Sequence, residues 1–388
     1  MEKIKAKHIV NYLKEHHGSM MVFLKELVAA ESPSTEVKSQ EQVMNLLIAA
    51  LKELHFYVLK IPGQTSGGYI YARPKDRVRN NQIQLLLGHC DTVWKIDTLK
   101  EMPIIQKGFK MQGPGVFDMK AGLTQIIFAL KAIRDLNLNC SITPVVLINS
   151  DEEIGSKDSS PAIERLSKIA DRAFVLEPPL GLQGKLKTAR KGIGRFTITV
   201  KGKPAHAGLN PDEGVSAIVE LSYQIQHLFS LNDFEKGITV NVGMIEGGTS
   251  ANVIAAQSKA VIDVRVHNQK DAAFITEKIL SLKPVNKNVV LDVEGYFGRA
   301  PMERTLKNQK LWEKAKTLGA LMDLQLEEAT AGGGSDGNTT SKYTATLDGL
   351  GTTGDGAHAR HEYIFTDKLI ERTALLTLLI TAESLKDD

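Results

Sequence analysis

Three short apolar runs in the first half of the chain alternate with stretches that carry apolar residues at helical spacing. The runs cover residues 83–87, 145–148 and 174–176, and the helix-like stretches cover residues 40–54 and 119–135. Strands that alternate with helices predict a parallel or mixed sheet with helices packed on it. This pattern places the chain in the α/β class.

The pattern changes near residue 190 and returns near residue 303. Between these points, alternating apolar residues mark strands near 196–200, 240–244, 262–266 and 289–293, with helices near 215–228 and 271–282. The order β-α-β-β-α-β predicts a ferredoxin-like sandwich. Helical spacing resumes at 304–322 and 366–385, where Thr366 is expected as an N-cap and Asp367 in the first turn. We predict a larger domain from residues 1–188 and 303–388, interrupted by an inserted domain at 189–302.

Composition excludes several classes of protein. The 388 residues include 48 basic and 45 acidic side chains, a net charge of +3 that gives no reason to expect nucleic acid or membrane partners. The sequence has no apolar stretch of about 18 residues and no apolar signal-peptide core at its start. Its two cysteines, Cys90 and Cys140, make a disulfide framework implausible and suit a reducing cytosol. We therefore expect a cytoplasmic protein.

Polar residues that could carry chemistry follow the apolar runs. The first run ends in His89-Cys90-Asp91, where the first and third residues share one face of the strand. Asp91 can therefore reach the second ring nitrogen of His89, as in metal-bound imidazoles, whereas Cys90 points the other way. A pair of this kind is, on its own, more often a surface contact than a metal site.

Acidic residues follow at two further points. Asp118 lies between a Gly-Pro-Gly turn and an amphipathic stretch, where an ordinary helix N-cap is the alternative. Asp151, Glu152 and Glu153 follow the second apolar run directly, and adjacent acids repel unless a cation is present. A solvated loop is the plain interpretation of this triplet. The sharper one makes one glutamate a metal ligand and the other a general base.

Two more candidates complete the set. Glu177 ends the third run before two prolines, and His358 lies in a glycine-rich loop, with His361 three residues later as the less favoured choice. The Gly-x-Gly at 113–115 lacks the third glycine of a dinucleotide-binding turn, and no Gly-x-Ser-x-Gly elbow is present. Two histidines and three carboxylates match a two-metal site, with zinc the first choice and other divalent metals possible. A shared aspartate would hold such ions ~3.5–4 Å apart.

The ordered motifs resemble one known family. They are GHCDTV, GPGVFDMKAG, NSDEEIGS, LEPP, GKPAHAG, NVIAA, DVRV, GGGSD and GDGAH, and they span about residues 85–363. This series is similar to that of the co-catalytic zinc exopeptidase and amidohydrolase family. Its members include glutamate carboxypeptidase of the carboxypeptidase G type, acetylornithine deacetylase, succinyl-diaminopimelate desuccinylase and aminoacylase. The resemblance implies a zinc-exopeptidase-like catalytic domain, with a mixed sheet and helices on both faces, and an inserted ferredoxin-like lid and dimerisation domain.

The resemblance also implies roles for the candidate residues. One zinc ion would be held by His89 and Glu177 and the other by Glu153 and His358. Asp118 would bridge the two ions, and the peptide bond after it is often cis in this family. Glu152 would act as the general base, and Asp91 would support His89.

Further roles are implied for the inserted domain and the loop after it. His206 resembles a histidine that reaches the partner subunit's active site and supports the oxyanion, with a turn cap as the alternative. Arg265 and Asn252 resemble residues that hold the substrate carboxylate, and a salt bridge on an edge strand is the alternative for Arg265. Backbone groups of Gly332, Gly333 and Gly334 would approach the substrate, or the run is a flexible loop. Asp336 is expected to be structural.

Taken together, the expected protein is a homodimer that binds two zinc ions. It would cleave an amide or peptide bond in a small N-acyl amino acid or peptide and release a C-terminal amino acid, with glutamate favoured. A deacylase of the acetylornithine deacetylase or succinyl-diaminopimelate desuccinylase type is the alternative, because it would share every metal ligand. A non-catalytic metal-binding scaffold is the second alternative, which the presence of Glu152 disfavours.

Overall fold

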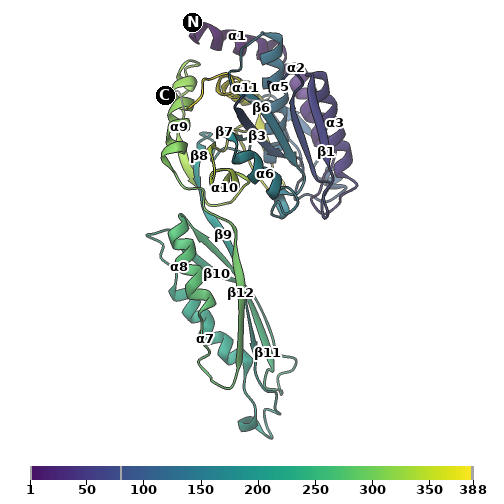
Figure 1. Ribbon diagram of the computed structural model, residues 1–388. Helices are drawn as coiled ribbons and strands as arrows, with labels where there is room; N and C mark the ends of the chain where they lie inside the picture. The colour runs from purple at the N-terminus through teal and green to yellow at the C-terminus, as the bar shows by residue number, and fades with distance from the viewer. Residues whose placement is uncertain (1, 79–80, 386–388) are drawn as a thin grey trace. The chain divides into compact units, whose positions relative to one another are not determined.

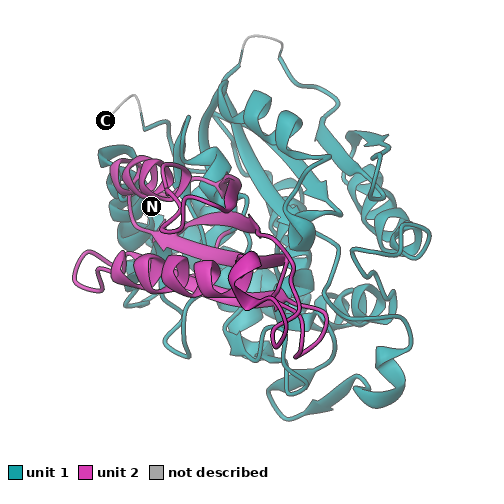
Figure 2. Ribbon diagram, turned by 90° about the horizontal axis from the view of Figure 1, so that it is seen from below, with its two compact units in different colours: residues 1–188, 304–330, 335–388 teal, residues 189–303, 331–334 magenta. Residues whose placement is uncertain are grey.

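The computed structural model describes residues 2–78 and 81–385, which belong to two compact units. Unit 1 comprises Met1–Thr188, Arg304–Thr330 and Ser335–Asp388, and unit 2 comprises Ala189–Glu303 and Ala331–Gly334 (Figure 2). The sequence-based division assigns residues 331–334 to the larger domain, whereas these residues cluster with unit 2.

Unit 1 is built on a six-stranded mixed sheet (Figure 1). Its order is β1 (Phe56–Ile61), β2 (Tyr69–Pro74), β6 (Thr143–Asn149), β3 (Ile83–His89), β7 (Ala170–Val175) and β14 (Ala345–Leu347). Strand β3 runs parallel to both β6 and β7, and β14 runs parallel to β7, whereas β1 and β2 are antiparallel additions at one edge. The apolar runs at 83–87 and 145–148 are thus neighbouring central strands, and every residue of β3 and β6 is buried.

Helices cover both faces of this sheet. Leu86 packs in the main core with α2 (His17–Ala29), α3 (Gln40–Glu53), α5 (Ala121–Asp135) and α11 (Thr366–Ile380). Leu85 and Leu87 alternate to the other face, where they pack against α6 (Ser160–Ser167). The remaining helices of unit 1 are α1 (Glu2–Glu15), α4 (Thr98–Glu101), α9 (Leu306–Ala320) and α10 (Gly337–Thr340).

Helix α11 begins directly after a strand, which corrects one prediction. Thr366 is the first helical residue, Phe365 occupies the N-cap position, and no side chain caps the helix. The backbone N–H of Thr366 instead donates to the carbonyl oxygen of Phe109. Thr366 is therefore not an N-cap, although Asp367 does lie in the first turn.

Two smaller sheets contain further residues of unit 1. One has the order β15 (Gly354–Asp355), β16 (Tyr363–Phe365), β5 (Lys110–Gln112) and β4 (Ile105–Lys107). The other pairs β13 (Glu328–Ala331) with β8 (Leu186–Arg190). The pairing of β16 with β5 brings the chain around residue 358 next to the chain around residue 115, and neither sheet was anticipated from the sequence.

Unit 2 has the predicted β-α-β-β-α-β order. It contains β9 (Gly192–Lys201), α7 (Ala217–Ser230), β10 (Thr239–Gly247), β11 (Gln257–Val266), α8 (Gln269–Leu280) and β12 (Val290–Arg299). The antiparallel sheet runs β10-β11-β9-β12, which is the ferredoxin-like order, and the two helices share an apolar core with one of its faces. Arg265 lies on β11, between β10 and β9, so the expectation of an edge strand at this residue is wrong.

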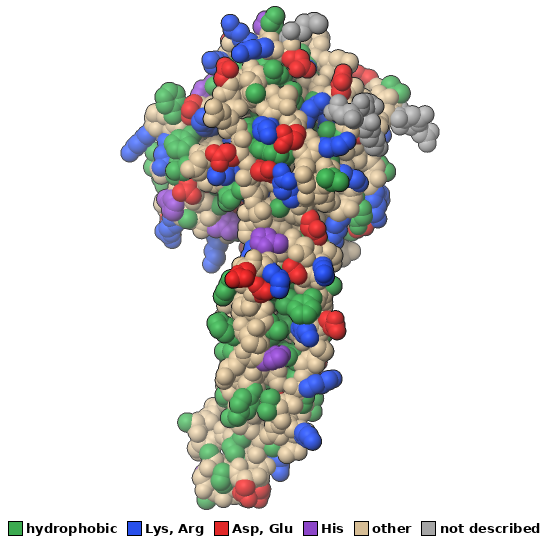
Figure 3. Space-filling view, turned by 90° about the vertical axis from the view of Figure 1, so that its left-hand side faces the viewer, with side chains coloured by type: hydrophobic (Ala, Val, Ile, Leu, Met, Phe, Trp, Pro, Cys, Tyr) green, Lys and Arg blue, Asp and Glu red, His purple; other side chains and the backbone are tan. Residues whose placement is uncertain are grey.

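The surface carries both signs of charge. Figure 3 shows acidic and basic side chains interspersed over the visible face, in keeping with the net charge of +3. Across residues 2–78 and 81–385, every helix falls short of the length and apolar character that a membrane crossing requires.

Candidate active site

Three neighbouring parallel strands of unit 1 deliver candidate ligands to one edge of the sheet. Strand β3 ends at His89, which is paired in register with Asn149 at the end of β6. Glu152 and Glu153 follow β6 in a short helical turn, and Glu177 follows β7 by two residues. Carboxyl ends of parallel strands meet at one edge, which is where α/β proteins bind their ligands.

Asp118 reaches this edge from a different element. It lies inside a π-helical turn, Val116–Lys120, but its own φ of −115° and ψ of 96° are not helical. Lys120, not Asp118, precedes the first residue of α5, so the N-cap interpretation of Asp118 is wrong. The peptide bond between Asp118 and Met119 is cis, as the resemblance implied.

Each of two histidine nitrogens faces two carboxylate oxygens from different residues. Nε2 of His89 lies 3.2 Å from Oδ1 of Asp118 and 3.4 Å from Oε1 of Glu177. Nε2 of His358 lies 3.5 Å from Oδ2 of Asp118 and 3.3 Å from Oε1 of Glu153. A single ring N–H cannot satisfy two acceptors, and these separations exceed the ~2.7–2.9 Å of a charge-assisted hydrogen bond. The two oxygens of Asp118 are thus shared between the two histidines.

These separations fit the ligand shell of a metal ion. Zinc bonds to nitrogen and oxygen of ~2.0–2.1 Å at tetrahedral angles put neighbouring ligand atoms about 3.3–3.4 Å apart. The ligand atoms of His89, Asp118 and Glu153 all lie within 4.8 Å of one another, as do those of His89, Glu152 and Glu177. Imidazole and carboxylate donors suit zinc and related divalent ions. The residues present therefore fit a site for two metal ions, to which Asp118 would contribute.

The acidic residues shift the pKa values of both histidines. Hydrogen bonds to Asp118 and Glu153 raise the pKa of His358 to about 10. Burial disfavours charge on His89, but its contacts with Asp118, Asp91 and Glu177 raise its pKa well above the ordinary value. Burial has the same adverse effect on the carboxylate of Asp118, yet His358 and His89 hold the pKa of Asp118 well below its usual range. Burial raises the pKa of Glu153. The cluster is thus a dense set of charges that a cation would stabilise.

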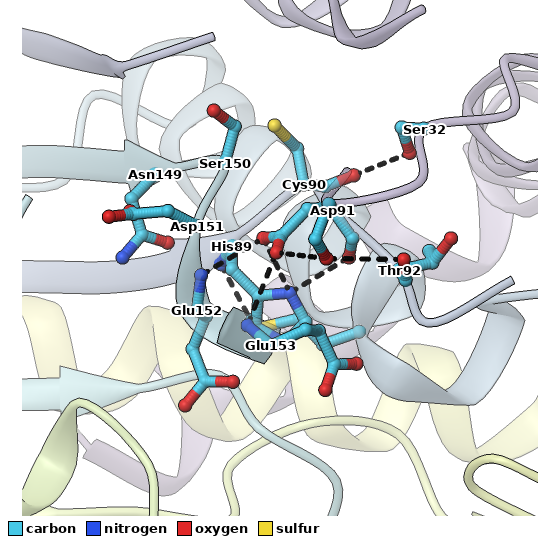
Figure 4. A network of polar contacts seen from close by, with 12 residues as sticks. Ser32, His89, Cys90, Asp91, Thr92, Asn149, Ser150, Asp151, Glu152 and Glu153 are labelled. Atoms are coloured by element: carbon cyan, nitrogen blue, oxygen red, sulfur yellow. Dashed lines mark hydrogen bonds and ion pairs between the residues drawn. The ribbon is translucent and has the colours of Figure 1, made fainter. Parts of the chain in front are cut away.

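Asp91 contacts His89 and the turn that carries Glu152 and Glu153 (Figure 4). Its backbone oxygen lies 3.0 Å and its Oδ1 lies 3.4 Å from Nδ1 of His89. The carboxylate also accepts the backbone N–H groups of Glu152 and Glu153 and the hydroxyl of Ser34. The backbone oxygen of Asp91 thus orients the ring of His89, and its carboxylate holds the turn that carries two glutamates.

Cys90 takes no part in this contact set. Its sulfur points away from His89, as the alternation of the strand predicts (Figure 4). The side chain is fully buried, and burial raises the pKa of its thiol to about 12. The thiolate that would bind a metal is therefore disfavoured.

Of the two histidines in the last glycine-rich loop, the structure brings His358 to the cluster. His358 has a left-handed backbone, with φ of 61°, which a non-glycine residue adopts rarely. His361 is exposed, and its ring lies close to Gly356. The order of preference inferred from the sequence matches this placement.

Sequence reasoning missed Glu362 and expected a structural role for Asp336. Glu362 is fully buried and accepts hydrogen bonds from three backbone N–H groups near Asp118 and from the indole of Trp94. Asp336 accepts from Ser156 and Asn149, which flank the Glu152–Glu153 turn. The contacts of Asp336 agree with the structural role expected from the GGGSD motif. Glu362 is an isolated acid in a loop, and such a residue gives no periodic signal in the sequence that would reveal it.

The remaining candidates belong to unit 2. The segments of His206 and Asn252 lie side by side, since Ala207 N–H donates to the backbone oxygen of Asn252 and His206 pairs with Val253. Nδ1 of His206 accepts the N–H groups of Gly208 and Leu209 at 3.1 Å each. An accepting Nδ1 has no hydrogen, so the ring presents its exposed Nε2 as a donor.

Arg265 and the glycine run also contact each other within unit 2. The guanidinium of Arg265 binds both carboxylate oxygens of Asp263, at 2.7 and 3.0 Å, and its Nη1 lies 3.5 Å from the backbone oxygen of Gly332. The backbone oxygens of Gly333 and Gly334 accept from Nη1 of Arg190. The salt bridge anticipated as the alternative for Arg265 thus exists, and one of the guanidinium nitrogens keeps only a long contact.

The sequence as a whole is similar to proteins of known class. A family model described as a peptidase dimerisation domain matches residues 188–282. Carboxypeptidase G2 of Pseudomonas sp. (strain RS-16) is 30% identical over 366 residues, which cover 92% of this chain and 87% of that protein. An acetylornithine deacetylase of Photorhabdus laumondii subsp. laumondii is 28% identical over 268 residues, or 62% of this chain and 66% of that protein.

Solved structures share the fold. The aminopeptidase PepT of Bacillus cereus ATCC 10987 superposes with a TM-score of 0.77 at 21% identity, covering 94% of this chain and 98% of that one. The YXEP protein of Bacillus subtilis, described as a dinuclear metal-binding peptidase of the M20 family, superposes with a TM-score of 0.69 at 15% identity, covering 95% and 98%. The likeness shows that this chain has the fold of these solved structures.

Proposed function

Since the chain belongs to the M20 family of metallopeptidases and amidohydrolases and is therefore a hydrolase, we propose that it uses two divalent metal ions, with zinc the first choice. With these ions it would release a C-terminal amino acid from a small peptide or an N-acyl amino acid. Release of a C-terminal amino acid is favoured because the relative at 30% identity over most of the chain is a carboxypeptidase. Glutamate is the first choice because the sequence motifs resemble those of the glutamate carboxypeptidase branch. The observation that carries the proposal is the pair of histidine nitrogens that share the carboxylate of Asp118.

In this proposal the five cluster residues hold the metals. His89 and Glu177 would hold one ion, Glu153 and His358 the other, and Asp118 would bridge them. A bound metal pair would supply Lewis acidity, which polarises the scissile carbonyl group and lowers the pKa of the attacking water. The contacts at 3.2–3.5 Å between these side chains support this assignment.

Glu152 would move the proton. Its carboxylate lies near His89 and Glu177 but has no part in the four nitrogen–oxygen contacts that define the pair. Glu152 would take a proton from water as the oxygen bonds to the carbonyl carbon. It would return that proton to the nitrogen as the carbon–nitrogen bond breaks, so that a free acid and a free amine leave.

His206 would stabilise the oxyanion of the tetrahedral intermediate. The two backbone donors on Nδ1 leave the exposed Nε2–H as the hydrogen-bond donor, which suits a developing negative charge. By family resemblance the site served would be that of a partner subunit. His206 would then act only in a dimer.

We propose a homodimer formed through unit 2. The matched dimerisation model, residues 188–282, covers α7 and β10. These elements expose several large apolar side chains, and β10 is an edge strand that can accept another strand. The exposed side chains are Ile218, Val219, Tyr223, Phe229, Met244 and Ile245. Light scattering behind size exclusion should give twice the chain mass, and a charged substitution at Ile245 should give the monomer and remove activity.

The substrate carboxylate would be held by Arg265 and Asn252, with backbone groups of Gly333 and Gly334 close to the substrate. Deacylation of an N-acyl amino acid is the competing function, and the 28% identity to an acetylornithine deacetylase supports it as the alternative. The non-catalytic scaffold is disfavoured, since Glu152 is present beside an intact ligand cluster.

Cys90 and Cys140 carry free thiols, and we propose the reducing cytoplasm as the compartment on that ground.

The test is amino-acid release from a pooled panel of N-acyl amino acids and dipeptides by the zinc-loaded protein. Release of glutamate above all others would support the carboxypeptidase assignment. Release of ornithine or diaminopimelate would move the protein to the deacylases. Binding of two zinc ions without any release would favour the scaffold, and failure to bind zinc would remove the metal assignment itself.

A further inference from the structure

Glu362 is a fully buried acid that accepts four hydrogen bonds. Its Oε1 accepts the backbone N–H groups of Phe117 and Asp118 at 2.9 and 3.0 Å. Its Oε2 accepts the backbone N–H of Gly115 at 2.9 Å and the indole N–H of Trp94 at 2.8 Å. All four partners are donors, so an ionised carboxylate, which has acceptors only, satisfies every one of them.

The four donors and Glu362 come from three segments that carry proposed metal ligands. Trp94 follows β3 and its terminal His89, and Gly115, Phe117 and Asp118 form the turn of the proposed bridging ligand. Glu362 itself lies four residues after His358 and directly before β16. One carboxylate therefore ties together the segments that set where both metals would bind.

The loop of His358 needs such support. His358 has φ of 61°, and Gly356, two residues earlier, has φ of 83°, so two left-handed residues occur close together. Within the loop, Ala359 N–H donates to the carbonyl of Gly356, and Glu362 N–H donates to the carbonyl of Ala359. The backbone N–H of Glu362 thus closes the last turn of this loop, and its side chain accepts hydrogen bonds from the turn that contains Asp118.

We propose that Glu362 is a positioning residue that fixes the gap between Asp118 and His358 and thereby sets the affinity for the metal ion held by Glu153 and His358. The inference rests on the proposed two-metal site. The gap concerned is the 3.5 Å between Nε2 of His358 and Oδ2 of Asp118. His89 and Glu177 reach Asp118 from the central sheet, so the first metal should depend less on Glu362.

A glutamine cannot do the same work. The amide has one acceptor oxygen, and its NH₂ group would face two of the four donors, so at least two hydrogen bonds are lost. Substitution of residues that orient metal ligands typically costs 10–100-fold in metal affinity. We expect Glu362→Gln to bind the first zinc ion almost as the wild type does and the second about 10–100-fold more weakly.

Glu220 offers a matched control in unit 2. It is also buried, and its carboxylate accepts the backbone N–H groups of Val285 and Asn286 at 2.9 Å each and the amide of Gln224. Glu220→Gln should lower stability by a similar mechanism and leave zinc binding unchanged. Equal loss of zinc in both variants would mean that general destabilisation explains the effect, and would overturn the proposal.

The experiment is a titration of metal-free protein with zinc in a metal-buffered solution, read by bound zinc per chain. A second readout is the emission of Trp94 in a Trp312→Phe background, because these are the chain's two tryptophans. The Trp94 signal should follow the second binding step, since its indole donates to Glu362. This signal does not depend on turnover or on the identity of the substrate.

The outcomes separate this inference from the proposed function. A wild-type protein that binds no metal pair would overturn the proposed function. Two zinc ions bound with wild-type affinity by Glu362→Gln would overturn the inference alone. If that variant fails to fold, Glu362→Asp keeps a carboxyl group but is one methylene shorter, so the second affinity should fall between those of wild type and Gln. Wild-type affinity in a folded Asp variant would equally overturn the inference.

Discussion

The backbone carbonyl oxygen of Asp91 lies 3.0 Å from Nδ1 of His89. A carbonyl oxygen only accepts hydrogen bonds, so Nδ1 must carry a hydrogen. In the neutral ring this leaves the lone pair on Nε2, the nitrogen that faces Asp118 and Glu177. The main chain of Asp91 therefore selects the tautomer that a metal-binding His89 requires.

The side chain of Asp91 has a separate task, which Asp91→Asn tests. Its carboxylate accepts the N–H groups of Glu152 and Glu153, and an amide would turn a donor toward one of them. Because the turn that carries Glu152 and Glu153 loses a hydrogen bond, we expect metal affinity to fall about 10–100-fold. The backbone contact to His89 remains, so the fold should be kept. Equilibrium zinc titration measures this fall.

Asp158→Asn is the control for that substitution. Asp158 also accepts backbone N–H groups, those of Thr65 and Ser66, but it touches none of the proposed ligands. Its substitution should leave zinc affinity unchanged. Unchanged affinity in Asp91→Asn as well would show that Asp91 does not orient the metal site.

The adjacent glutamates should separate cleanly by function. Glu152→Gln removes the proposed base but none of the four histidine–carboxylate contacts, so both zinc ions should bind while kcat falls by ~10²–10⁴. Glu153→Gln weakens the contact with His358 and should lose about one zinc ion per chain. Bound zinc and kcat, measured on the same samples, distinguish the two. Full turnover by Glu152→Gln would assign the base elsewhere.

Zinc binding should release protons near neutral pH. The pKa of His358 is raised to about 10 and that of His89 is raised well above its ordinary value, so both rings are protonated at pH 7 before metal binds. A metal ligand must be deprotonated, so about two protons should leave per chain. Calorimetry in buffers of different ionisation enthalpy measures them, and His358→Ala should release about one fewer. Release of no protons would contradict the raised pKa values.

The raised pKa of His358 also predicts how the stability of the metal-free protein changes with pH. His358 titrates at ~6.5 when unfolded and at about 10 when folded. A raised folded pKa adds stability that is full below ~6.5 and is lost as pH rises through about 10. Melting temperature of the metal-free protein should therefore fall between pH 7 and 10 more than that of His358→Ala. Parallel curves would mean that His358 is not held by Asp118 and Glu153.

The ligands at the strand ends could be predicted because a run of apolar residues in the sequence identifies a buried strand. The apolar runs before His89 and Glu153 identify central strands, and parallel strands must deliver their next residues to one edge. Asp118 was placed only by its motif, since its non-helical backbone inside a helical turn follows no periodicity. Even there, an N-cap stayed open as the alternative.

What could not be predicted depends on contacts between distant segments. Glu362 meets Phe117 and Asp118 across about 245 positions, through a sheet of two- and three-residue strands too short to show a pattern. The clustering of residues 331–334 with unit 2 likewise depends on Arg190, which binds the backbone of Gly333 and Gly334. Such contacts are decided by packing rather than by local propensity.

Arg265 should recognise a carboxylate through the nitrogen that Asp263 does not occupy. Asp263 binds Nε and Nη2, whereas Nη1 has only a 3.5 Å contact with the carbonyl of Gly332. Hydrogen bonds to charged groups contribute ~1.5–3 kcal/mol, or roughly 10–150-fold in affinity. We expect Arg265→Ala to raise KM by about that factor for substrates with a free carboxylate, with kcat changed much less.

The same substrates with the carboxylate amidated provide the decisive comparison, because they lack the charge that Arg265 would bind. Their kcat/KM should be low in the wild type and nearly unaffected by Arg265→Ala. Arg195 lies on the neighbouring strand, opposite Asp263 in the register, so Arg195→Ala removes another guanidinium from this part of the sheet without touching the Gly332 contact. It should leave KM unchanged. An equal loss for free and amidated substrates would mean that Arg265 serves the fold through Asp263 and does not bind the substrate carboxylate.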